Sequence, residues 1–262
     1  VDFSSNGVTD EAEAGVQLME RLEEAVRIRL ISDVPLGAFL SGGVDSSAVV
    51  AMMAGLNDDP VNTCSISFGD PAFNESHFAS MVAERYRTDH RVGEVSPDDF
   101  ELIDKLADLY DEPYADSSAM PSYRVCELAK LRVTGALSGD GGDENLAGYR
   151  RYRWHLYEER LRSMLPLSLR RPLFSTLGRL YPKADWAPRV FRAKSTFEAL
   201  ARDDVEGYFH SVSILGDKIR GNLFSDTLRR DLQGHQAVDV FREHAANAPD
   251  HPLSRVQYLD LK

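Results

Sequence analysis

The sequence predicts an α/β protein with a twisted, mostly parallel sheet, helices on both faces of that sheet, and a helical C-terminal region. Three observations lead to this class. Short apolar, β-branched stretches alternate with helical patterns, as in parallel strands joined by crossover helices. Two of the predicted strands end in glycine-rich loops. After about Tyr149 the strand pattern stops, and helical stretches broken by prolines follow.

The predicted strands are short apolar runs that end at turn residues. The clearest is VNTCSISF, because most of its residues are apolar or β-branched. Buried parallel strands have this near-continuous apolar character. The four predicted strands cover residues 34–40, 61–68, 91–95 and 132–138.

The predicted helices show apolar residues at a spacing of three or four. In the first one Val16, Met19, Leu22 and Val26 form such a stripe, and Ser-Asp-Val-Pro ends it. Ser96 and Pro97 are typical of a helix start, with a cap followed by proline at the first helical position. The predicted helices cover 11–30, 45 to about 56, a segment around 78–82, a segment from 97 to about 110, and 120–131.

Composition and charge restrict the partners. The chain has 262 residues, of which 43% are hydrophobic and 27% charged, as in an ordinary globular protein. A net charge of −12 argues against non-specific binding to nucleic acid or to an anionic membrane. No apolar run approaches the length of about 18 residues that a membrane helix needs, and no secretion signal is recognisable. Cys64 and Cys126 lie in apolar runs, so we expect buried free thiols in a reducing compartment, the cytoplasm.

A glycine loop follows the first predicted strand. Residues 39–47 have the sequence FLSGGVDSS, and a helical pattern begins at Asp45. Gly42 and Gly43 allow a sharp turn and a close approach of an anion to the backbone. The N–H groups at the start of the helix, together with its dipole, favour a phosphate group. The hydroxyl groups that can add hydrogen bonds are those of Ser41, Ser46 and Ser47.

Asp45 gives this loop a second property. A carboxylate in an anion site is expected where it holds a divalent cation that bridges to phosphates. The alternative is structural, a helix after a glycine turn with Ser and Asp as caps. The string matches neither the P-loop nor the dinucleotide fingerprint. It resembles the S-G-G-x-D-S loop of the ATP pyrophosphatases, which split ATP into AMP and pyrophosphate while adenylating a substrate, and this favours the functional interpretation.

A second glycine loop, SGDGGDE at residues 138–144, follows the fourth predicted strand. By itself it could be a surface loop whose acids cap a helix, or a calcium-binding turn, although the EF-hand spacing is missing. The carboxyl ends of parallel strands meet at one edge of a sheet, where ligands bind at the topological switch point. Asp45 and Asp143 could there hold Mg²⁺ against the β- and γ-phosphates of ATP, since Mg²⁺ prefers one or two carboxylates with phosphate and water.

Four segments extend the resemblance. SDVPLGAFLSGGVDSS, CSISF, DEPYADSSAMPSY and SGDGGDENLAGYRRY occur in this order. They resemble the synthetase domain of the glutamine-dependent asparagine synthetases, over roughly residues 18–152 and more weakly beyond. The resemblance implies an adenine nucleotide α-hydrolase-like fold. It also implies a linker at 1–10 from a missing N-terminal domain, an ATP-pyrophosphatase α/β domain at 11–150, and a helical extension at 151–262 that is truncated at its C-terminal end.

The same resemblance implies roles for individual residues. The loop at 41–47 would hold pyrophosphate, and Asp45 and Asp143 would hold Mg²⁺. Asp140 and Glu144 are the candidate catalytic residues. The adenosine part of ATP would contact Leu40, Ile66, Ser138 and Gly139 through backbone and side chains.

The implied activity is that of an amide-forming ligase. In that family the side-chain carboxylate of aspartate attacks the α-phosphorus of ATP, and ammonia then displaces AMP to give asparagine. The implied partners are ATP, aspartate or another carboxylate, ammonia, and an N-terminal glutaminase domain that supplies the ammonia. Nucleic acid and membrane are not expected as partners, and a homodimer is left open.

Three departures from the family pattern leave questions open. Asp140 stands where the family usually has glutamate. A nucleophilic N-terminal cysteine is missing, so we do not expect this chain to hydrolyse glutamine by itself. The family sequence continues past a segment like LSRVQYLDLK to a lysine that contacts phosphate, which leaves open whether the fragment turns over.

Other interpretations remain at this stage. A β-lactam synthetase or a peptide-cyclising relative would use the same loops on another carboxylate. A nucleotide-binding regulatory module would keep the fold without turnover. A sulfur- or tRNA-modifying pyrophosphatase is disfavoured by the acidic charge and the cysteine spacing. The basic run at 150–153 is interpreted as a solvated helix face rather than as a phosphate contact.

Overall fold

The computed structural model of the chain describes residues 10–70, 74–95, 102–111, 116–181 and 193–262. These residues belong to two compact units that divide between Gly142 and Asp143. The predicted helix start at Ser96 and Pro97 and most of the predicted linker lie outside the described residues. The division into the three predicted segments, with boundaries at 10 and 150, stays a prediction.

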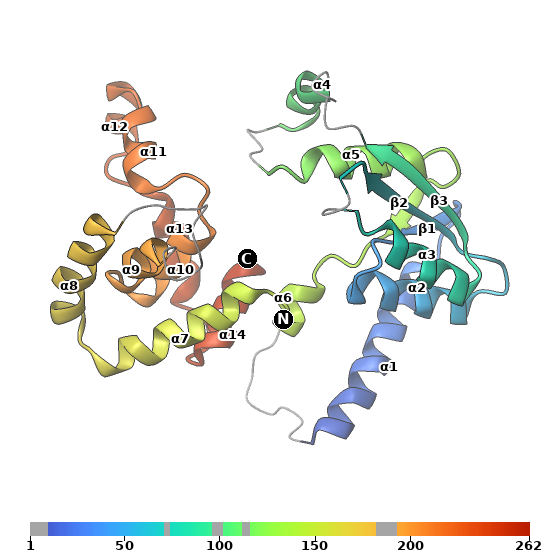
Figure 1. The fold of residues 1–262 in the computed structure, drawn as a ribbon, viewed down its shortest axis with the longest axis horizontal. Helices are drawn as coiled ribbons and strands as arrows, with labels where there is room; N and C mark the ends of the chain where they lie inside the picture. The colour runs from blue at the N-terminus through green and yellow to red at the C-terminus, as the bar shows by residue number, and fades with distance from the viewer. Residues whose placement is uncertain (1–9, 71–73, 96–101, 112–115, 182–192) are drawn as a thin grey trace. The chain divides into compact units, whose positions relative to one another are not determined.

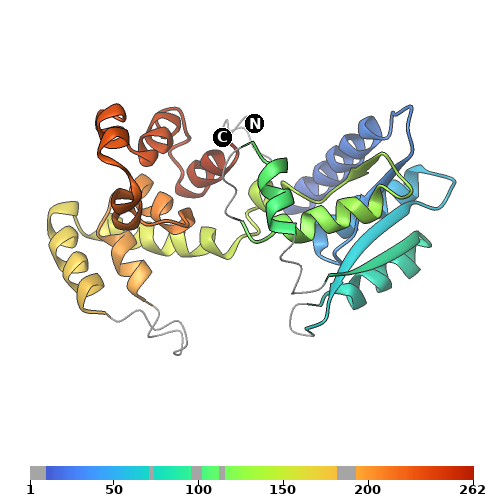
Figure 2. The same ribbon diagram turned by 90° about the horizontal axis from the view of Figure 1, so that it is seen from above.

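The first unit contains a four-stranded sheet in which every pairing is parallel. Its strand order is β3-β2-β1-β4. Ala38 in β1 lies beside Thr63 of β2 on one side and Leu137 of β4 on the other. The predicted fold class, a parallel sheet flanked by helices, is confirmed (Figures 1 and 2). The strands are β1 (Leu36–Phe39), β2 (Asn62–Phe68), β3 (Asp89–Val95) and β4 (Gly135–Leu137).

Helices cover both faces of this sheet (Figure 1). Side chains of a strand alternate between its two faces. Ala38 and Leu40 accordingly pack into a core with α1, α2 and α3, whereas Phe39 packs with Val125 and Leu128 of α5. The described helices of this unit are α1 (Glu11–Arg29), α2 (Val44–Leu56), α3 (Ser76–Tyr86), α4 (Leu102–Leu109) and α5 (Ala119–Ala129).

Two details of burial differ from the prediction. The apolar stripe of α1 enters the core only at its C-terminal end, since Val26 is buried whereas Val16 and Met19 are exposed. Both cysteines are free, as predicted, and Cys64 is buried. Cys126 is exposed, which corrects the expectation of two buried thiols, because α5 turns another face to the sheet.

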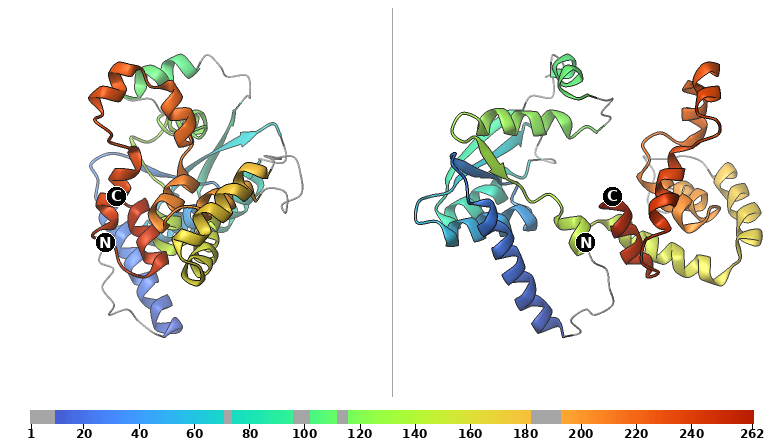
Figure 3. Two further views of the ribbon diagram at one scale, coloured as in Figure 1. Left: turned by 90° about the vertical axis from the view of Figure 1, so that its left-hand side faces the viewer. Right: turned by 180° about the vertical axis from the view of Figure 1, so that it is seen from behind.

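The second unit, from Asp143 onward, contains helices and no strand among its described residues. Helix α14 packs along α7, and α8 packs on α9 (Figures 1 and 3). The helices from this boundary on are α6 (Gly142–Leu146), α7 (Arg150–Met164), α8 (Leu167–Leu180), α9 (Lys194–Leu200), α10 (Asp204–Val212), α11 (Asp217–Leu223), α12 (Asp226–Asp231), α13 (Ala237–Ala245) and α14 (Pro252–Asp260).

The basic run at the start of α7 is not a uniformly solvated helix face. Arg150 and Arg153 are exposed, as predicted. The prediction is wrong for the two residues between them. Arg151 forms an ion pair with Asp260 at 2.7 Å, and the Tyr152 side chain is 1% exposed. Both differences from the prediction, the ion pair of Arg151 and the burial of Tyr152, have one cause, because α14 packs on this side of α7.

Within the described residues, no helix is both long enough and apolar enough to span a membrane.

Candidate active site

The strand order defines a switch point between β1 and β4. From β1 the chain proceeds outward through β2 to β3, and it then returns to add β4 on the opposite side of β1. Connections that leave neighbouring strands in opposite directions open a crevice at the carboxyl ends of those strands, where α/β proteins bind ligands. Ser41 follows β1 and Ser138 follows β4, so both glycine loops lie at this edge.

The first loop is fixed by its own serine side chains. The hydroxyl oxygens of Ser41 and Ser46 lie 2.9 Å apart, and the Ser41 N–H donates to the Ser46 Oγ at 3.2 Å. The Gly43 N–H donates to the Ser41 Oγ at 3.2 Å. These bonds close the chain between the end of β1 and the first turn of α2, so the loop has a defined shape.

Gly42 is required by both its backbone conformation and its neighbours. Its φ of +84° belongs to the left-handed region that favours glycine. A Cβ at this position would lie 2.6 Å from the backbone nitrogen of Ala79 and 2.6 Å from the Cβ of Phe78. The loop therefore packs directly against the first turns of α3, with no space for a side chain.

The first turn of α2 has the properties of an anion site. Its N-cap is Gly43, which provides no side-chain cap, and the first intrahelical hydrogen bond is donated by the Ser47 N–H to the Gly43 carbonyl at 3.0 Å. The N–H groups of the preceding turn have no partner within the helix. The Ser47 Oγ is buried and has no hydrogen-bond partner in the described part of the chain. These donors fit a phosphate group.

The second loop lies directly on this turn. A Cβ at Gly139 would be 2.6 Å from the Ser46 nitrogen, and a Cβ at Gly142 would be 2.7 Å from the Asp45 Oδ1. Gly141 has a φ of +90°. The backbone at Gly139 and Gly142 can approach Asp45 and Ser46 this closely only because neither residue has a side chain. The structure therefore brings the two glycine loops together within the first unit.

Ser138 and Asp140 form a small hydrogen-bonded turn in the second loop. The Ser138 hydroxyl donates to the Asp140 Oδ2 at 2.9 Å, and the Asp140 N–H donates back to the Ser138 Oγ at 3.4 Å. Asp140 is exposed. Its carboxylate is thus oriented by a neighbour and open to a ligand.

Asp143 and Glu144 belong to the second unit, where the turn after α6 holds them. The Tyr149 hydroxyl donates to the Glu144 Oε1 at 2.7 Å, and this hydrogen bond is the main reason why the pKa of Tyr149 is raised to about 12. The backbone of Gly148 lies against the Asp143 carboxylate so closely that a Cβ would overlap it. The pairing of Asp45 with Asp143 involves both units and stays a prediction.

The predicted adenosine contacts are only partly accessible. The Leu40 side chain is 1% exposed and lies in the core, and its N–H donates to the Cys64 carbonyl at 2.9 Å. Leu40 could therefore offer a ligand only its carbonyl group. Ile66 is half-buried in β2, where it pairs with Gly93 of β3.

No group of three or more His, Cys, Asp or Glu side chains converges among the described residues. A metal cage made of protein ligands alone is therefore not present in this part of the chain. A Mg²⁺ site with two carboxylates, completed by phosphate and water, does not require such a group.

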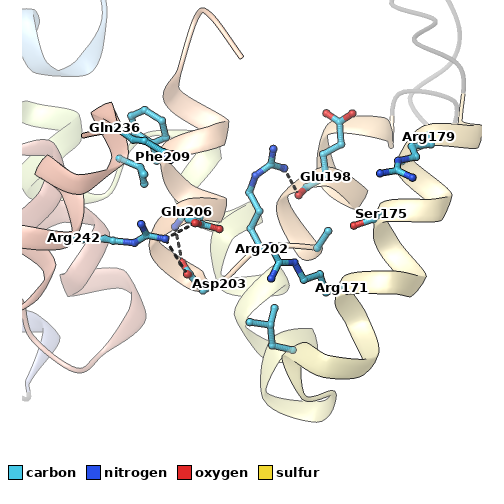
Figure 4. A pocket seen from close by; sticks show the side chains of 14 residues that line it. Arg171, Ser175, Arg179, Glu198, Arg202, Asp203, Glu206, Phe209, Gln236 and Arg242 are labelled. Carbon is cyan, nitrogen blue, oxygen red and sulfur yellow. Dashed lines mark hydrogen bonds and ion pairs between the residues drawn. The ribbon is translucent and has the colours of Figure 1, made fainter. Parts of the chain in front are cut away.

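A separate cavity of about 570 Å³ lies within the helical unit (Figure 4). Arginines from α8 and from the end of α9 point into it, and Arg242 on the opposite wall forms ion pairs with Asp203 and Glu206. It contains none of the residues that were predicted from the glycine loops. Among its lining residues are Arg171, Ser175, Arg179, Glu198, Arg202 and Phe209.

The fold and the loops define a class: a parallel α/β protein with two glycine loops, one of them followed by a helix start that lacks a side-chain cap, at the switch point of its sheet. The sequence profile of the asparagine synthase family matches residues 17–262. The chain therefore belongs to the asparagine synthase family, and the resemblance predicted from the motifs is confirmed.

Curated relatives carry related names. The chain is similar to a putative asparagine synthetase (glutamine-hydrolysing) 2 of Methanocaldococcus jannaschii, with 47% identity over 49% of this chain and 25% of the relative. It is 26% identical to asparagine synthetase (glutamine-hydrolysing) 1 of Bacillus subtilis over 97% of this chain and 38% of the relative. A putative asparagine synthetase of Mycobacterium bovis is 31% identical over 92% of this chain and 35% of the relative. The chain thus spans well under half the length of each.

Proposed function

We propose that this chain forms the ATP-binding and amide-forming part of an asparagine synthetase-type ligase. One observation carries the proposal: the two glycine loops, from the carboxyl ends of adjacent parallel strands, touch each other at Asp45, Ser46, Gly139 and Gly142. This contact combines an anion-binding helix start with carboxylates that can hold a cation. The names of the relatives, asparagine synthetase (glutamine-hydrolysing), support the choice of reaction.

The first loop would bind the phosphates that become pyrophosphate. Gly42 and Gly43 leave the backbone bare, and the start of α2 provides uncapped N–H groups. The buried Ser47 hydroxyl, which has no partner in the described residues, would gain one from a phosphate oxygen. Donors fixed in advance stabilise the negative charge of the leaving group without reorganising during the reaction.

Asp45 and Asp143 are the residues that would hold Mg²⁺. Asp45 lies in the first turn of α2, and Asp143 follows Gly142 in sequence. When bound, Mg²⁺ neutralises charge on the pyrophosphate.

The proposed reaction has two steps. A carboxylate oxygen of the aspartate side chain attacks the α-phosphorus, and the bond from that phosphorus to the oxygen bridging to the β-phosphorus breaks, releasing pyrophosphate. The nitrogen of ammonia then attacks the acyl carbon and loses a proton, while AMP leaves with the electrons of the C–O bond, so that asparagine forms. Holding both reactants in one site lowers the entropic part of the barrier. Asp140 and Glu144 are proposed to orient the acyl-adenylate or to handle a proton.

The proposed source of ammonia is a glutaminase domain of the complete protein. The relatives are named as glutamine-hydrolysing enzymes and are more than twice as long as the matched segments. The adenosine part of ATP would contact the Leu40 backbone, Ile66, Ser138 and Gly139. For an enzyme with this activity we propose a cytoplasmic location.

The test uses the complete protein that contains this chain. It is incubated with ATP, Mg²⁺, an ammonium salt and a panel of carboxylic acids, and AMP and pyrophosphate are measured. Pyrophosphate release that depends on aspartate, with formation of asparagine, supports the proposal. An absence of AMP with every acid would contradict a ligase and favour a nucleotide-binding regulatory module.

A second candidate substrate class is favoured by Asp140. The family usually has glutamate here, and the shorter carboxylate is held by Ser138 and open to a ligand. A site altered by one methylene could accept another carboxylate, as in a β-lactam synthetase or a peptide-cyclising enzyme. Pyrophosphate release with an acid other than aspartate, in the same panel, would select this alternative.

A further inference from the structure

Gln257 connects helix α14 to the end of the short helix α6. Its side chain is buried, and its Nε2 donates to the carbonyl oxygens of Glu144 at 2.8 Å and Asn145 at 3.0 Å. The last carbonyls of a helix have no partner within that helix and need one elsewhere. In α6, which has five residues, one amide side chain satisfies two of them. Ala147, with a φ of +57°, then ends the helix.

Asp260 lies one turn further along α14 and holds the start of α7. Its carboxylate accepts hydrogen bonds from Arg151 at 2.7 Å, from the Tyr152 hydroxyl at 2.6 Å and from the Tyr208 hydroxyl at 2.7 Å. The Asp260 side chain is 9% exposed. Burial and the hydrogen bond to this carboxylate both raise the pKa of Tyr152 and of Tyr208. Both tyrosine hydroxyls therefore keep their protons at neutral pH and donate to the carboxylate.

The two α14 contacts flank the turn that holds the acidic side chains. Tyr149 donates to the Glu144 carboxylate, and the guanidinium carbon of Arg151 lies 3.6 Å from the centre of the Tyr149 ring. Asp260 thus fixes Arg151, Arg151 covers Tyr149, and Tyr149 holds Glu144. Gln257 holds the same segment through the backbone carbonyls of Glu144 and Asn145.

We propose that Gln257 and Asp260 are positioning residues, which act through α6 and its following turn on the carboxylates of Asp143 and Glu144. The proposal rests on the proposed function, because in that function Asp143 holds Mg²⁺ and Glu144 is a candidate catalytic residue. Helix α14 would fix the positions of both carboxylates. Gln257 and Asp260 are three positions apart and therefore lie on one face of α14, where Gln257 contacts the end of α6 and Asp260 the start of α7. Neither residue needs to touch a substrate.

The experiment compares Gln257→Leu with Arg255→Met in the complete protein. Arg255 also attaches α14 to a neighbour, since its guanidinium donates to Asp204 of α10 at 2.6 Å, and the guanidinium's other hydrogen-bond and ion-pair partners among the described residues are Pro249 and Asp250, which precede α14. Both variants lose a polar contact between α14 and a neighbouring helix, buried at Gln257 and partly exposed at Arg255. If the leucine variant does not fold, Gln257→Met replaces it, because methionine keeps the length of the side chain without a donor.

The first readout is amide hydrogen exchange of residues 143–149, which requires no activity. We expect exchange about tenfold faster in Gln257→Leu, in line with the loss of one or two hydrogen bonds, and little change there in Arg255→Met. Equal exchange of this segment in both variants would overturn the positioning role.

The second readout is the Mg²⁺ concentration that gives half-maximal AMP formation. In Gln257→Leu we expect this concentration to rise about three- to tenfold and kcat to fall about tenfold, with the KM for ATP changed less, because the pyrophosphate loop is untouched. Arg255→Met should keep the wild-type Mg²⁺ requirement. An unchanged requirement in Gln257→Leu would contradict the proposal, whereas a wild-type protein that forms no AMP contradicts the proposed function and leaves the exchange result to decide the positioning role.

Discussion

Adding a side chain at position 42 should lower the stability of the protein. Gly42→Ala would combine a left-handed backbone with a Cβ that meets the backbone of α3. We expect a loss of stability of roughly 2 kcal/mol or more and a fall in Tm of about 4–8 °C, together with weaker ATP binding. Thermal unfolding and ATP titration measure these changes.

Gly55→Ala is the matched control for this substitution. Gly55 lies near the other end of α2, and a Cβ there would meet nothing within 4 Å. Since alanine is the better helix former by about 1 kcal/mol, this variant should keep or raise the Tm. Equal Tm values and equal ATP affinities for the two variants would show that the loop does not need glycine at position 42.

Asp45→Asn tests the metal role of the first loop. The substitution keeps the shape of the side chain but removes its charge, so Mg²⁺-dependent AMP formation in the complete protein should be abolished. The fold should persist, because a carboxylate in the first turn of a helix contributes only about 0.3–1 kcal/mol through the dipole. Asp58→Asn, an exposed position just beyond α2, should leave AMP formation unchanged. Unaltered AMP formation in Asp45→Asn would refute the metal role.

Asp140→Glu tests which substrate class the second loop serves. If the position acts as the family glutamate does, the longer side chain should leave aspartate-dependent activity equal or higher. A large loss would show that the shorter carboxylate is matched to another acid. The kcat/KM values for aspartate and for the best alternative acid decide between these outcomes.

Among the elements, α7 contains a buried histidine that makes the helical unit sensitive to acid. The His155 side chain is 4% exposed, and its Nδ1 has no hydrogen-bond partner in the described residues. Burial lowers the pKa of His155 to about 4, and the charge of Arg162 acts in the same direction. The other charged groups that face it are Glu159, Asp204 and Arg255.

The sign of the pH dependence follows from this shift. An unfolded histidine binds a proton near its ordinary pKa of 6.5, whereas folded His155 stays neutral down to about 4. The unfolded state therefore binds more protons than the folded state between these two pH values. The contribution of neutral His155 to the free energy of unfolding is fully present above pH 6.5. It is lost as the pH falls toward 4, by about 3 kcal/mol in all.

His155→Gln should remove this loss. We expect the free energy of unfolding to depend less on pH between 6.5 and 4 in the variant than in the wild type, as measured by denaturant titration at several pH values. His251→Gln, at an exposed position, serves as the control. An identical pH profile for wild type and His155→Gln would contradict the burial effect.

The same scale shows what local sequence patterns can predict. The second helix and strand were predicted to within one or two residues, because Val, Ile and Thr runs and the glycine loop mark their ends. The role of Arg151 and Tyr152 could not be predicted, since their partner Asp260 is 108 residues away from Tyr152 and no local pattern joins them. Gln257 likewise contacts a backbone far along the chain, which a motif search does not detect.

For the whole molecule, the sequence predicted the sheet and the position of both loops at strand ends. It predicted that both loops share one edge of the sheet, but not that Gly139 and Gly142 lie directly against Asp45 and Ser46, because that contact depends on β4 pairing with β1 rather than with β3. The apolar run that ends at Leu40 was predicted as a strand, and the Leu40 side chain does lie in the core, which leaves only its backbone for the adenosine contact that the resemblance implies. Motifs thus indicate which residues belong to a site, whereas the strand order determines which of them touch.

The strand order also has a consequence for synthesis on the ribosome. Gly135, the partner of Leu36 in the sheet, follows it about one hundred residues later. Until that segment has left the ribosome, the β1 edge of the nascent sheet exposes unpaired N–H and C=O groups, which are a template for pairing with other chains. The strand that brings the second glycine loop to the first therefore also closes the edge. A nascent chain that stalls before β4 lacks the contact between the loops and has an edge prone to aggregation.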